Sequence, residues 1–296
     1  MNECRPVPLP NYDSPSELKR LLDSCGFGMK KRFGQNFLVD GKVRSELLSF
    51  LQIRKGTKIW EIGPGLGAMT AMILEKGGEL TAFEIDKGFS KLLTVFFSHK
   101  KNFKLVEGDV QKTWKNEIKE FGKPEIFFGN LPYNISLEVI SAMIEQAPAF
   151  DEVLITVQKE AAERITAKPN NKNYTALSVL CGALYECKIM KIIPASAFWP
   201  KPAVESAVVL FIPKKNIFTE KDFFLFAKLV KTLFSSRRKT IKNNLNIWLH
   251  SNCREYSAEE ILYKAGLHKN LRAENLFLCD FLLLYEKINS IGGCRK

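Results

Sequence analysis

The sequence predicts an α/β fold: a twisted, mainly parallel sheet with helices on both faces, followed by a small all-α domain. From Thr57 onward, short apolar runs alternate with segments of helical periodicity, a pattern typical of such a sheet. After Pro213 the strand signals stop and only helical periodicity remains. We therefore expect three parts: an N-terminal extension at 1–28, an α/β domain at 29–213 and a helical domain at 214–296.

Each element is justified by its local pattern. The first helix is expected at 16–25, with Ser14 as its cap and Pro15 in its first turn, behind a loose, proline-containing leader. Strands are expected at 58–62, 79–86, 102–108, 125–128, 152–157, 188–193 and 207–212. Further helices are expected at 42–51, 68–76, 136–146, 159–167, 175–185, 223–234, 238–248, 258–265 and 276–288. The last two strands have no helix-length segment between them, so we expect them to pair antiparallel.

The charge balance indicates a polyanionic partner or a generally basic surface. The chain of 296 residues carries 44 Lys and Arg against 32 Asp and Glu, a formal net charge of +12. Basic faces bind the phosphate backbones of nucleic acids without reading their sequence. A basic surface also serves solubility, so charge alone leaves both interpretations open.

The cysteines and histidines give no sign of a metal site. The seven cysteines are scattered, no two have C-x-x-C spacing, and the three histidines do not cluster with them. We expect no metal and no disulfide framework, which suits a reduced compartment. The sequence carries no secretory signal and no long uncharged apolar run, so we expect a soluble, cytoplasmic protein that does not enter a membrane. We also expect it to act as a monomer.

A glycine-rich turn follows the first strand of the predicted sheet. Gly63, Gly65 and Ala68 satisfy the loose G-x-G-x-x-G/A pattern, which indicates that the backbone approaches a ligand closely there. Glu61 stands just before the first glycine and would repel a pyrophosphate, whereas it suits a ligand that bears a protonated amino group. A dinucleotide-dependent oxidoreductase is one hypothesis for this turn.

Two further acids end the second and third predicted strands. Glu84 lies about twenty residues after the glycine turn, where a carboxylate takes the ribose hydroxyls of an adenosine. Asp109 could accept a hydrogen of the adenine amino group. Either acid alone could be a solvated charge at a strand end. Together with Glu61 and the glycine turn, they indicate a site for S-adenosylmethionine, a sulfonium nucleoside with an amino acid tail and no phosphate.

The acceptor side of the site is predicted at Asn130-Leu131-Pro132-Tyr133, which follows an apolar run that reads as a buried strand. The Asn130 side-chain oxygen and the carbonyl before the proline can each accept an N–H bond from an amine on a flat ring. Pro132 fixes the backbone, and Tyr133 offers a face on which a base can stack. A strand-end Asn-x-Pro can also be only a turn.

With a methyl sulfonium as the electrophile, this arrangement predicts in-line methyl transfer to an exocyclic amine. The sulfonium is already a good leaving group, so neither a metal nor a covalent intermediate is needed and catalysis is mostly positioning. The target base must be unpaired or flipped out to reach the methyl group. The acceptor motif argues against the oxidoreductase hypothesis.

Two basic clusters are candidates for contacts with RNA. The first, Lys30-Lys31-Arg32, precedes a segment that contains Asn36 and Leu38 and that is either a surface turn or a flap over RNA and a bound small molecule. Charge runs are most often solvated helix faces, but the net charge and the predicted target favour RNA here. The second cluster comprises Arg237, Arg238, Lys239 and Lys242.

Taken together, these blocks resemble the ribosomal RNA adenine dimethyltransferase family over residues 29–288. The matching blocks are 33–38, 61–67, 84–86, 130–136, 158–164, 198–202 and 237–240. The resemblance implies a Rossmann-like, S-adenosylmethionine-dependent methyltransferase in ribosome biogenesis. Its implied reaction is dimethylation of the N6 amines of two adjacent adenosines, in a hairpin loop near the 3′ end of small-subunit (16S) ribosomal RNA.

The resemblance also implies roles for individual residues. Tyr133 and Phe198 correspond to the aromatic pair that sandwiches the target adenine. We expect the helical domain to bind the RNA and the neighbouring ribosomal surface. The positions that correspond to donor contacts are Asn36, Leu38, Gly63, Glu84, Asp109 and Asn130.

Residues 130–136 have the form of the small-subunit branch, whereas the resistance methylases of large-subunit RNA usually carry Ile before the proline. Two departures from the family pattern lie away from the predicted chemistry: Thr175 where glycine is expected, and Ala273 where proline is common. A large-subunit RNA dimethyltransferase and a non-catalytic nucleic-acid-binding relative are the alternatives. The intact acids and Asn130 argue against lost chemistry.

Overall fold

The computed structural model describes residues 7–26, 36–131, 133, 136–146, 150–215, 218–252 and 256–290. The chain divides into two compact units. The first comprises Met1–Ala142, Pro148–Ala162 and Lys188–Ile212, and the second comprises Met143–Ala147, Glu163–Cys187 and Pro213–Lys296. Residues 163–187 therefore group with the C-terminal helices. The domain limits predicted at 28/29 and 213/214 stay a prediction.

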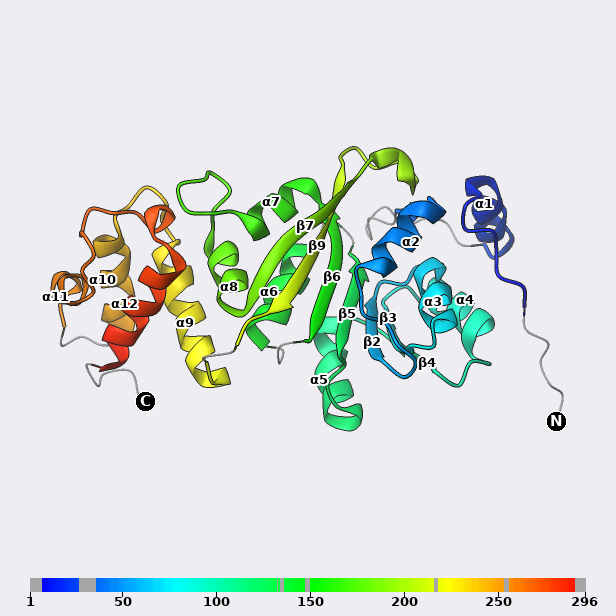
Figure 1. Ribbon diagram of the computed structural model, residues 1–296, viewed down its shortest axis with the longest axis horizontal. Coiled ribbons are helices and arrows are strands. Elements are labelled where there is room, and N and C mark those ends of the chain that lie inside the picture. Colours follow the sequence, from blue (N-terminus) through cyan, green and yellow to red (C-terminus); the bar gives the residue numbers. More distant parts are fainter. Residues whose placement is uncertain are drawn as a thin grey trace. The chain divides into compact units, whose positions relative to one another are not determined.

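A seven-stranded sheet forms the centre of the first unit (Figure 1). Its strands are β2 (Lys58–Ile62), β3 (Glu79–Glu84), β4 (Phe103–Glu107), β5 (Ile126–Asn130), β6 (Glu152–Gln158), β7 (Tyr185–Ile193) and β9 (Ser206–Pro213). Their order is β4-β3-β2-β5-β6-β9-β7, in which β2 to β6 are parallel and β9 runs antiparallel to β6. The mainly parallel sheet confirms the predicted α/β class, and the last two strands are neighbours, as expected.

The order of the strands reverses between β2 and β5. In open α/β sheets, ligands bind outside the carboxyl ends of the strands at such a point. Ile126, Phe127 and Phe128 of β5 are buried, as expected for a parallel strand covered on both faces. At Gly129, a Cβ would lie 2.9 Å from Cδ2 of Leu131 and 3.3 Å from the carbonyl oxygen of Ile62 on β2, so a larger residue would crowd both.

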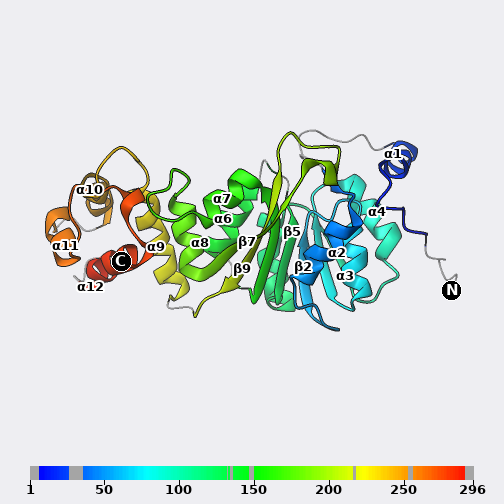
Figure 2. The same cartoon turned by 45° about the horizontal axis from the view of Figure 1, so that its top comes forward.

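Seven helices accompany the sheet in the described part of the chain, and α2 and α3 lie against it near β2 (Figure 2). They are α1 (Pro15–Ser24), α2 (Gly41–Ser49), α3 (Ala68–Glu75), α4 (Lys87–Phe97), α5 (Val110–Phe121), α6 (Ser136–Gln146) and α7 (Lys159–Thr166). The last two begin in the first unit and end in the second.

Helices α4 and α5 were missing from the predicted elements, although each begins at an aspartate N-cap that the sequence shows. Asp86 caps α4 by accepting from the N–H of Gly88 at 2.7 Å. Asp109 caps α5 by accepting from the N–H of Gln111 at 3.0 Å. An aspartate before a periodic apolar segment is a standard N-terminal signal, so these helices could have been predicted.

The residues before α1 correct one expectation. Ser14 caps the helix as predicted, and Leu18 and Leu22 are buried in the core of the first unit. The leader is not loose immediately before the helix, because Tyr12 packs against the same core and Asp13 forms an ion pair with a buried arginine. The proline-rich composition gave no sign of these contacts.

The second unit is largely helical. Its elements include α8 (Ala176–Leu184), α9 (Glu220–Leu233), α10 (Ile241–Asn252), α11 (Ala258–Lys264), η3 (Ala273–Asn275) and α12 (Leu278–Ser290). Helix α9 packs against α8, α10 and α12, and its Leu229, Val230 and Leu233 are fully buried. Among the described residues, no helix has the length and apolar character needed to cross a membrane.

Candidate active site

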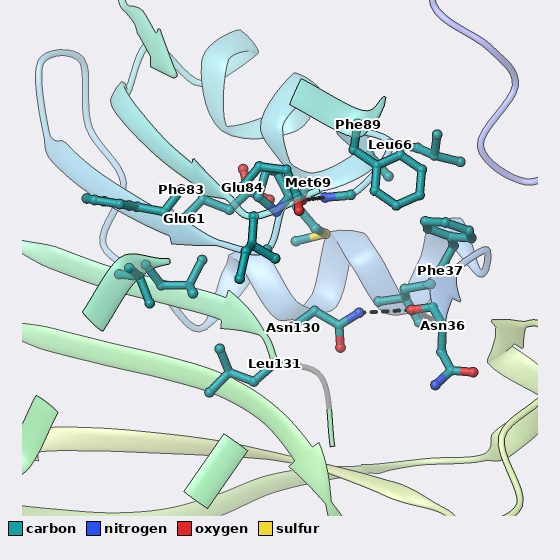
Figure 3. A pocket seen from close by; sticks show the side chains of 18 of the residues that line it. Asn36, Phe37, Glu61, Leu66, Met69, Phe83, Glu84, Phe89, Asn130 and Leu131 are labelled. Atoms are coloured by element: carbon teal, nitrogen blue, oxygen red, sulfur yellow. Dashed lines mark hydrogen bonds between the residues drawn. The ribbon is translucent and has the colours of Figure 1, made fainter. Parts of the chain in front are cut away.

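A cavity of about 300 Å³ opens at the carboxyl ends of β2, β3 and β5 (Figure 3). Leu131 and Tyr133 of the predicted acceptor motif line it. The residues predicted to contact a donor all line it too: Asn36, Leu38, Glu61, Gly63, Gly65, Glu84, Asp109 and Asn130. Segments far apart in the sequence therefore meet here, as expected where parallel strands end at one edge of a sheet.

The glycine turn after β2 forms one wall of the cavity. Gly63, Gly65 and Gly67 have φ values of 68°, 57° and 86°, in the left-handed region that is costly for an L side chain. At Gly67 a Cβ would also come within 2.5 Å of the Phe97 ring. The N–H of Gly65 donates to Oε2 of Glu84 at 3.2 Å, which ties the turn to β3.

Two buried glutamates, Glu61 and Glu84, place acidic groups in the wall of the cavity (Figure 3). Oε2 of Glu61 accepts from the hydroxyl of Thr70 on α3 at 2.6 Å, and burial raises the pKa of Glu61 to about 8 despite this bond. Oε1 of Glu84 accepts from the N–H of Asp86 at 2.8 Å. Burial raises the pKa of Glu84 to about 7, although this bond and the one from Gly65 oppose the rise.

No cationic side chain balances these acids inside the cavity: its described lining residues include no Lys, Arg or His. A bound cation that brings N–H and O–H donors would favour the ionised forms of both carboxyls. The ionised forms would repel a pyrophosphate. The donor set therefore fits the predicted sulfonium nucleoside with its amino acid tail and does not fit a dinucleotide.

Asp109 serves two purposes at the end of β4. One carboxylate oxygen, Oδ1, is bonded to the first turn of α5 as its cap. The side chain is half-buried at the wall of the cavity. Its capping role explains an aspartate at this position even without a ligand, so its predicted contact with an adenine stays a prediction.

Asn130 is the last residue of β5 and is held by the segment that contains Asn36. Its Nδ2 donates to the carbonyl oxygen of Asn36 at 3.3 Å (Figure 3). Because the amide nitrogen is engaged there, the side-chain oxygen points away from Asn36. The N–H of the buried Leu131 donates to the carbonyl of Thr156 on β6 at 3.1 Å, which fixes the chain where it leaves the strand.

Tyr133 has a partner that the sequence did not reveal. Its hydroxyl shares a hydrogen bond of 2.5 Å with Oγ of Ser206, the first residue of β9. Ser206 is fully buried, and burial raises the pKa of Tyr133. Ser206 reaches this place because β9 runs antiparallel to β6, where it stands opposite Gln158. No local motif marks it.

Phe198 lies beside the cavity rather than in its wall. It is 3% exposed and belongs to β8 (Phe198–Trp199), which pairs antiparallel with β1 (Phe37–Leu38). In this pair it stands opposite Leu38, which does line the cavity. Its predicted stacking role stays a prediction. Pro132, Lys30, Lys31 and Arg32 lie outside the described residues.

Several lining residues were missed by the sequence reasoning. Phe37 and Phe89 pack edge to face with ring centroids 5.7 Å apart (Figure 3). Tyr12 comes from the segment before α1, and its hydroxyl donates to the carbonyl of Leu66 in the glycine turn at 3.0 Å. Apolar and aromatic residues of this kind are indistinguishable from ordinary core positions in a sequence.

The second predicted basic cluster divides into paired and unpaired members. Arg237 donates to the carbonyl of Lys172 and to the Glu274 carboxylate, both at 2.9 Å. Lys242 donates to a glutamate of α11 at 2.7 Å. The remaining two residues, Arg238 and Lys239, are exposed, and no described residue pairs with their side chains.

Comparisons with known proteins point to one family. A family model described as ribosomal RNA adenine dimethylase matches residues 26–287. The chain is 61% identical over 284 residues to ribosomal RNA small subunit methyltransferase A of Treponema denticola, covering 95% of this chain and 97% of that protein. It is 42% identical over 282 residues to the protein of the same name in Borreliella burgdorferi, covering 95% and 96%.

Solved structures share the fold. A dimethyladenosine transferase from Plasmodium falciparum superposes with a TM-score of 0.72 at 24% identity, over 86% of this chain and 98% of that one. The 23S rRNA methyltransferase ErmE superposes with a TM-score of 0.63 at 22% identity, over 85% and 99%. The predicted Rossmann-like methyltransferase fold is thereby confirmed.

Proposed function

The chain belongs to the ribosomal RNA adenine dimethylase family, and from this premise we propose that it dimethylates the N6 amines of two adjacent adenosines near the 3′ end of 16S ribosomal RNA. The methyl donor is S-adenosylmethionine, and the reaction belongs to ribosome biogenesis. One observation carries the proposal: a single cavity joins the buried acids of a donor site to the Asn130 motif of an acceptor site. We further propose that the protein is a cytoplasmic monomer.

In this proposal, the acids at the strand ends hold the donor. Glu61 takes the protonated amino group of its tail, Glu84 takes the ribose hydroxyls, and Asp109 takes a hydrogen of the adenine amine. Asn36 and Leu38 close the other side of the cavity. When bound, S-adenosylmethionine supplies a methyl group on a positively charged sulfur, which is an electrophile without further activation.

The acceptor residues position the target amine. In the first transfer, the side-chain oxygen of Asn130 and the carbonyl of Leu131 would accept hydrogen bonds from the two N–H groups of the N6 amine, which would aim its lone pair at the methyl carbon. The N–C bond would form as the S–C bond breaks, S-adenosylhomocysteine would leave, and the proton of the methylated amine would pass to water. The ring of Tyr133 stacks on the adenine, with Phe198 on the opposite face. These contacts strengthen as positive charge develops on the nitrogen, so they lower the barrier by electrostatic preorganisation.

A methylation assay tests this function. The protein is incubated with isotopically labelled S-adenosylmethionine and either undermethylated small subunits or large-subunit RNA, and the modified nucleosides are analysed by mass. We expect N6,N6-dimethyladenosine in the small-subunit RNA. Label in large-subunit RNA alone would indicate the resistance-type reaction. RNA binding without transfer to either substrate would indicate a non-catalytic relative.

Arg238 and Lys239 are expected to contact RNA phosphates, because both side chains are exposed in a basic segment and available for an anion. Replacing both with alanine should weaken RNA binding and make the slope of log K against log salt shallower by about 1.5, since each neutralised phosphate contributes about 0.7 to 0.9. Filter binding over a range of salt concentrations measures this slope.

A charge-matched control is available for this measurement. Lys100→Ala with Lys101→Ala removes two exposed lysines just before β4, at the opposite end of the strands from the cavity. This variant should keep the wild-type slope. If the Arg238 and Lys239 double variant also keeps the wild-type slope, then these two residues do not contact RNA phosphates. Arg237 is kept in both because it is bonded to Lys172 and Glu274.

A further inference from the structure

The segment just before α1 supplies part of the wall of the donor cavity. Tyr12 and Leu18 both line it, although the match to the family begins only at residue 26. Leu18 is 1% exposed, and Leu22 on the next turn of α1 is also buried. The apolar face of α1 therefore packs into the first unit and carries Tyr12 with it.

A buried arginine anchors this segment to the segment that contains Leu38. Nη1 of Arg44 donates to the carbonyl of Leu38 at 2.7 Å, and Nη2 forms an ion pair with Asp13. Gly41 makes room for this contact, because a Cβ there would lie 2.9 Å from Oδ2 of Asp13. The position of Tyr12 is thus fixed through its neighbour Asp13, which is held by an arginine whose side chain is only 8% exposed.

The hydroxyl of Tyr12 is oriented by the glycine turn. Its single hydrogen is donated to the carbonyl oxygen of Leu66 at 3.0 Å, so the phenol oxygen can only accept a further bond. Glu61 lies close enough that its charge raises the pKa of Tyr12, in addition to the larger effect of burial. Thr70 likewise donates its hydroxyl hydrogen to Oε2 of Glu61, so Oε1 of Glu61 accepts no bond from Thr70.

We propose that Tyr12 is a donor-binding residue, whose phenol oxygen and the Glu61 carboxylate together bind the protonated amino group of the donor's amino acid tail. This inference rests on the proposed function, because it takes S-adenosylmethionine as the ligand. A primary ammonium group carries three N–H donors and needs several acceptors when it leaves water. Tyr12 supplies a neutral acceptor in the wall of the cavity that Glu61 also lines.

Tyr12 also contributes to ligand specificity. When a nucleoside lacks the amino group, the phenol oxygen of Tyr12 and the Glu61 carboxylate receive no N–H donors from it. Buried acceptors left unpaired in this way lower the affinity for that nucleoside. Tyr12 thus discriminates ligands by their tail, whereas Glu84 and Asp109 contact the adenosine part that such ligands share. The two parts of the site can therefore be probed with two nucleosides.

The test compares calorimetric binding of S-adenosylhomocysteine, which carries the amino acid tail, with that of 5′-methylthioadenosine, which lacks it. Tyr12→Phe should weaken S-adenosylhomocysteine about tenfold, the loss expected for one hydrogen bond to a charged group. Its affinity for 5′-methylthioadenosine should stay as in the wild type. A phenylalanine keeps the ring in the wall, so the fold is preserved.

Tyr174→Phe is the matched control, because its hydroxyl also donates to a backbone carbonyl, that of Leu276 at 3.1 Å, and does not line the cavity. It should leave both affinities unchanged. Equal weakening of both nucleosides by Tyr12→Phe, or weakening of neither, would overturn the role of Tyr12 alone. A wild-type protein that binds neither nucleoside would overturn the proposed function, and this inference with it.

Discussion

Replacing Asn130 with alanine is expected to slow methyl transfer about a thousandfold, the effect of removing one preorganised electrostatic contact from a transition state. The donor should still bind, because the buried acids that hold its amino and hydroxyl groups are untouched. The physical reason is that Asn130 acts on the amine, whose partial charge grows only as the new bond forms. The measurement is a single-turnover rate at saturating donor and RNA, with S-adenosylhomocysteine binding followed by calorimetry.

Asn102→Ala provides the control for this loss. Its amide nitrogen donates to the carbonyl of Gly78 at 2.7 Å, so the substitution removes an amide–carbonyl bond of the same kind as that between Asn130 and Asn36. It lies just before β4, at the opposite end of the strands from the cavity. Its single-turnover rate should remain near that of the wild type. A near-normal turnover of Asn130→Ala would show that Asn130 does not contribute to methyl transfer.

The second large effect is expected for Glu61→Gln, which should stabilise the empty protein and weaken donor binding. Burial raises the pKa of Glu61 from 4.5 to about 8, so between these values the folded state binds a proton that the unfolded state has released. Stability is therefore lost as pH rises through this window. Glutamine does not titrate, so the variant should be more stable at pH 7 by on the order of 3 kcal/mol.

Donor binding should change in the opposite direction. A bound ammonium favours the ionised carboxylate, so the wild type should release a proton on binding S-adenosylhomocysteine near neutral pH, and glutamine cannot. We expect affinity to fall at least about tenfold, the lower end for a hydrogen bond to a charged group. Denaturant unfolding at several pH values gives the stability, and calorimetry in buffers of different ionisation enthalpy counts the protons.

Glu79→Gln is the control, because it makes the same change at an exposed position on the first residue of β3. It should alter neither the pH dependence of stability nor proton release. If Glu61→Gln unfolds with the same pH dependence as the wild type, then Glu61 is ionised in the empty cavity. In that case its charge would be balanced by a group other than the donor.

The sequence was sufficient for the parts of the site that lie directly after a strand. Glu84, Asp109 and Asn130 each follow an apolar run, and parallel strands end at a common edge, so their convergence could be inferred without coordinates. The same reasoning brings the glycine turn, which also follows a strand, to the edge of the sheet that carries the acceptor motif. Helices α4 and α5 were missed for a different reason. Asp86, the cap of α4, was assigned to the second strand, and Asp109, the cap of α5, was interpreted only as a ligand-binding or strand-end charge.

Only the tertiary structure could reveal the residues that reach the site from elsewhere. Tyr12 and Leu66 are 54 residues apart, and the contact depends on how α1 packs and on the ion pair of Asp13. Tyr133 and Ser206 are 73 residues apart and meet because β9 inserts antiparallel beside β6. Tyr12 and Ser206 carry no local sequence signal, because each is brought to the site by tertiary packing and not by its neighbours in the chain.

The electrostatic state of the acids was also decided by the fold. In the sequence, Glu61 is one carboxylate before a glycine, and its type alone suggests an ionised group at neutral pH. In the structure it is 2% exposed and bonded to Thr70 beside a second buried acid. The sequence therefore determined which chemical groups gather at the strand ends. Burial determined the charge they carry, because desolvation depends on the surrounding atoms and not on the residue type.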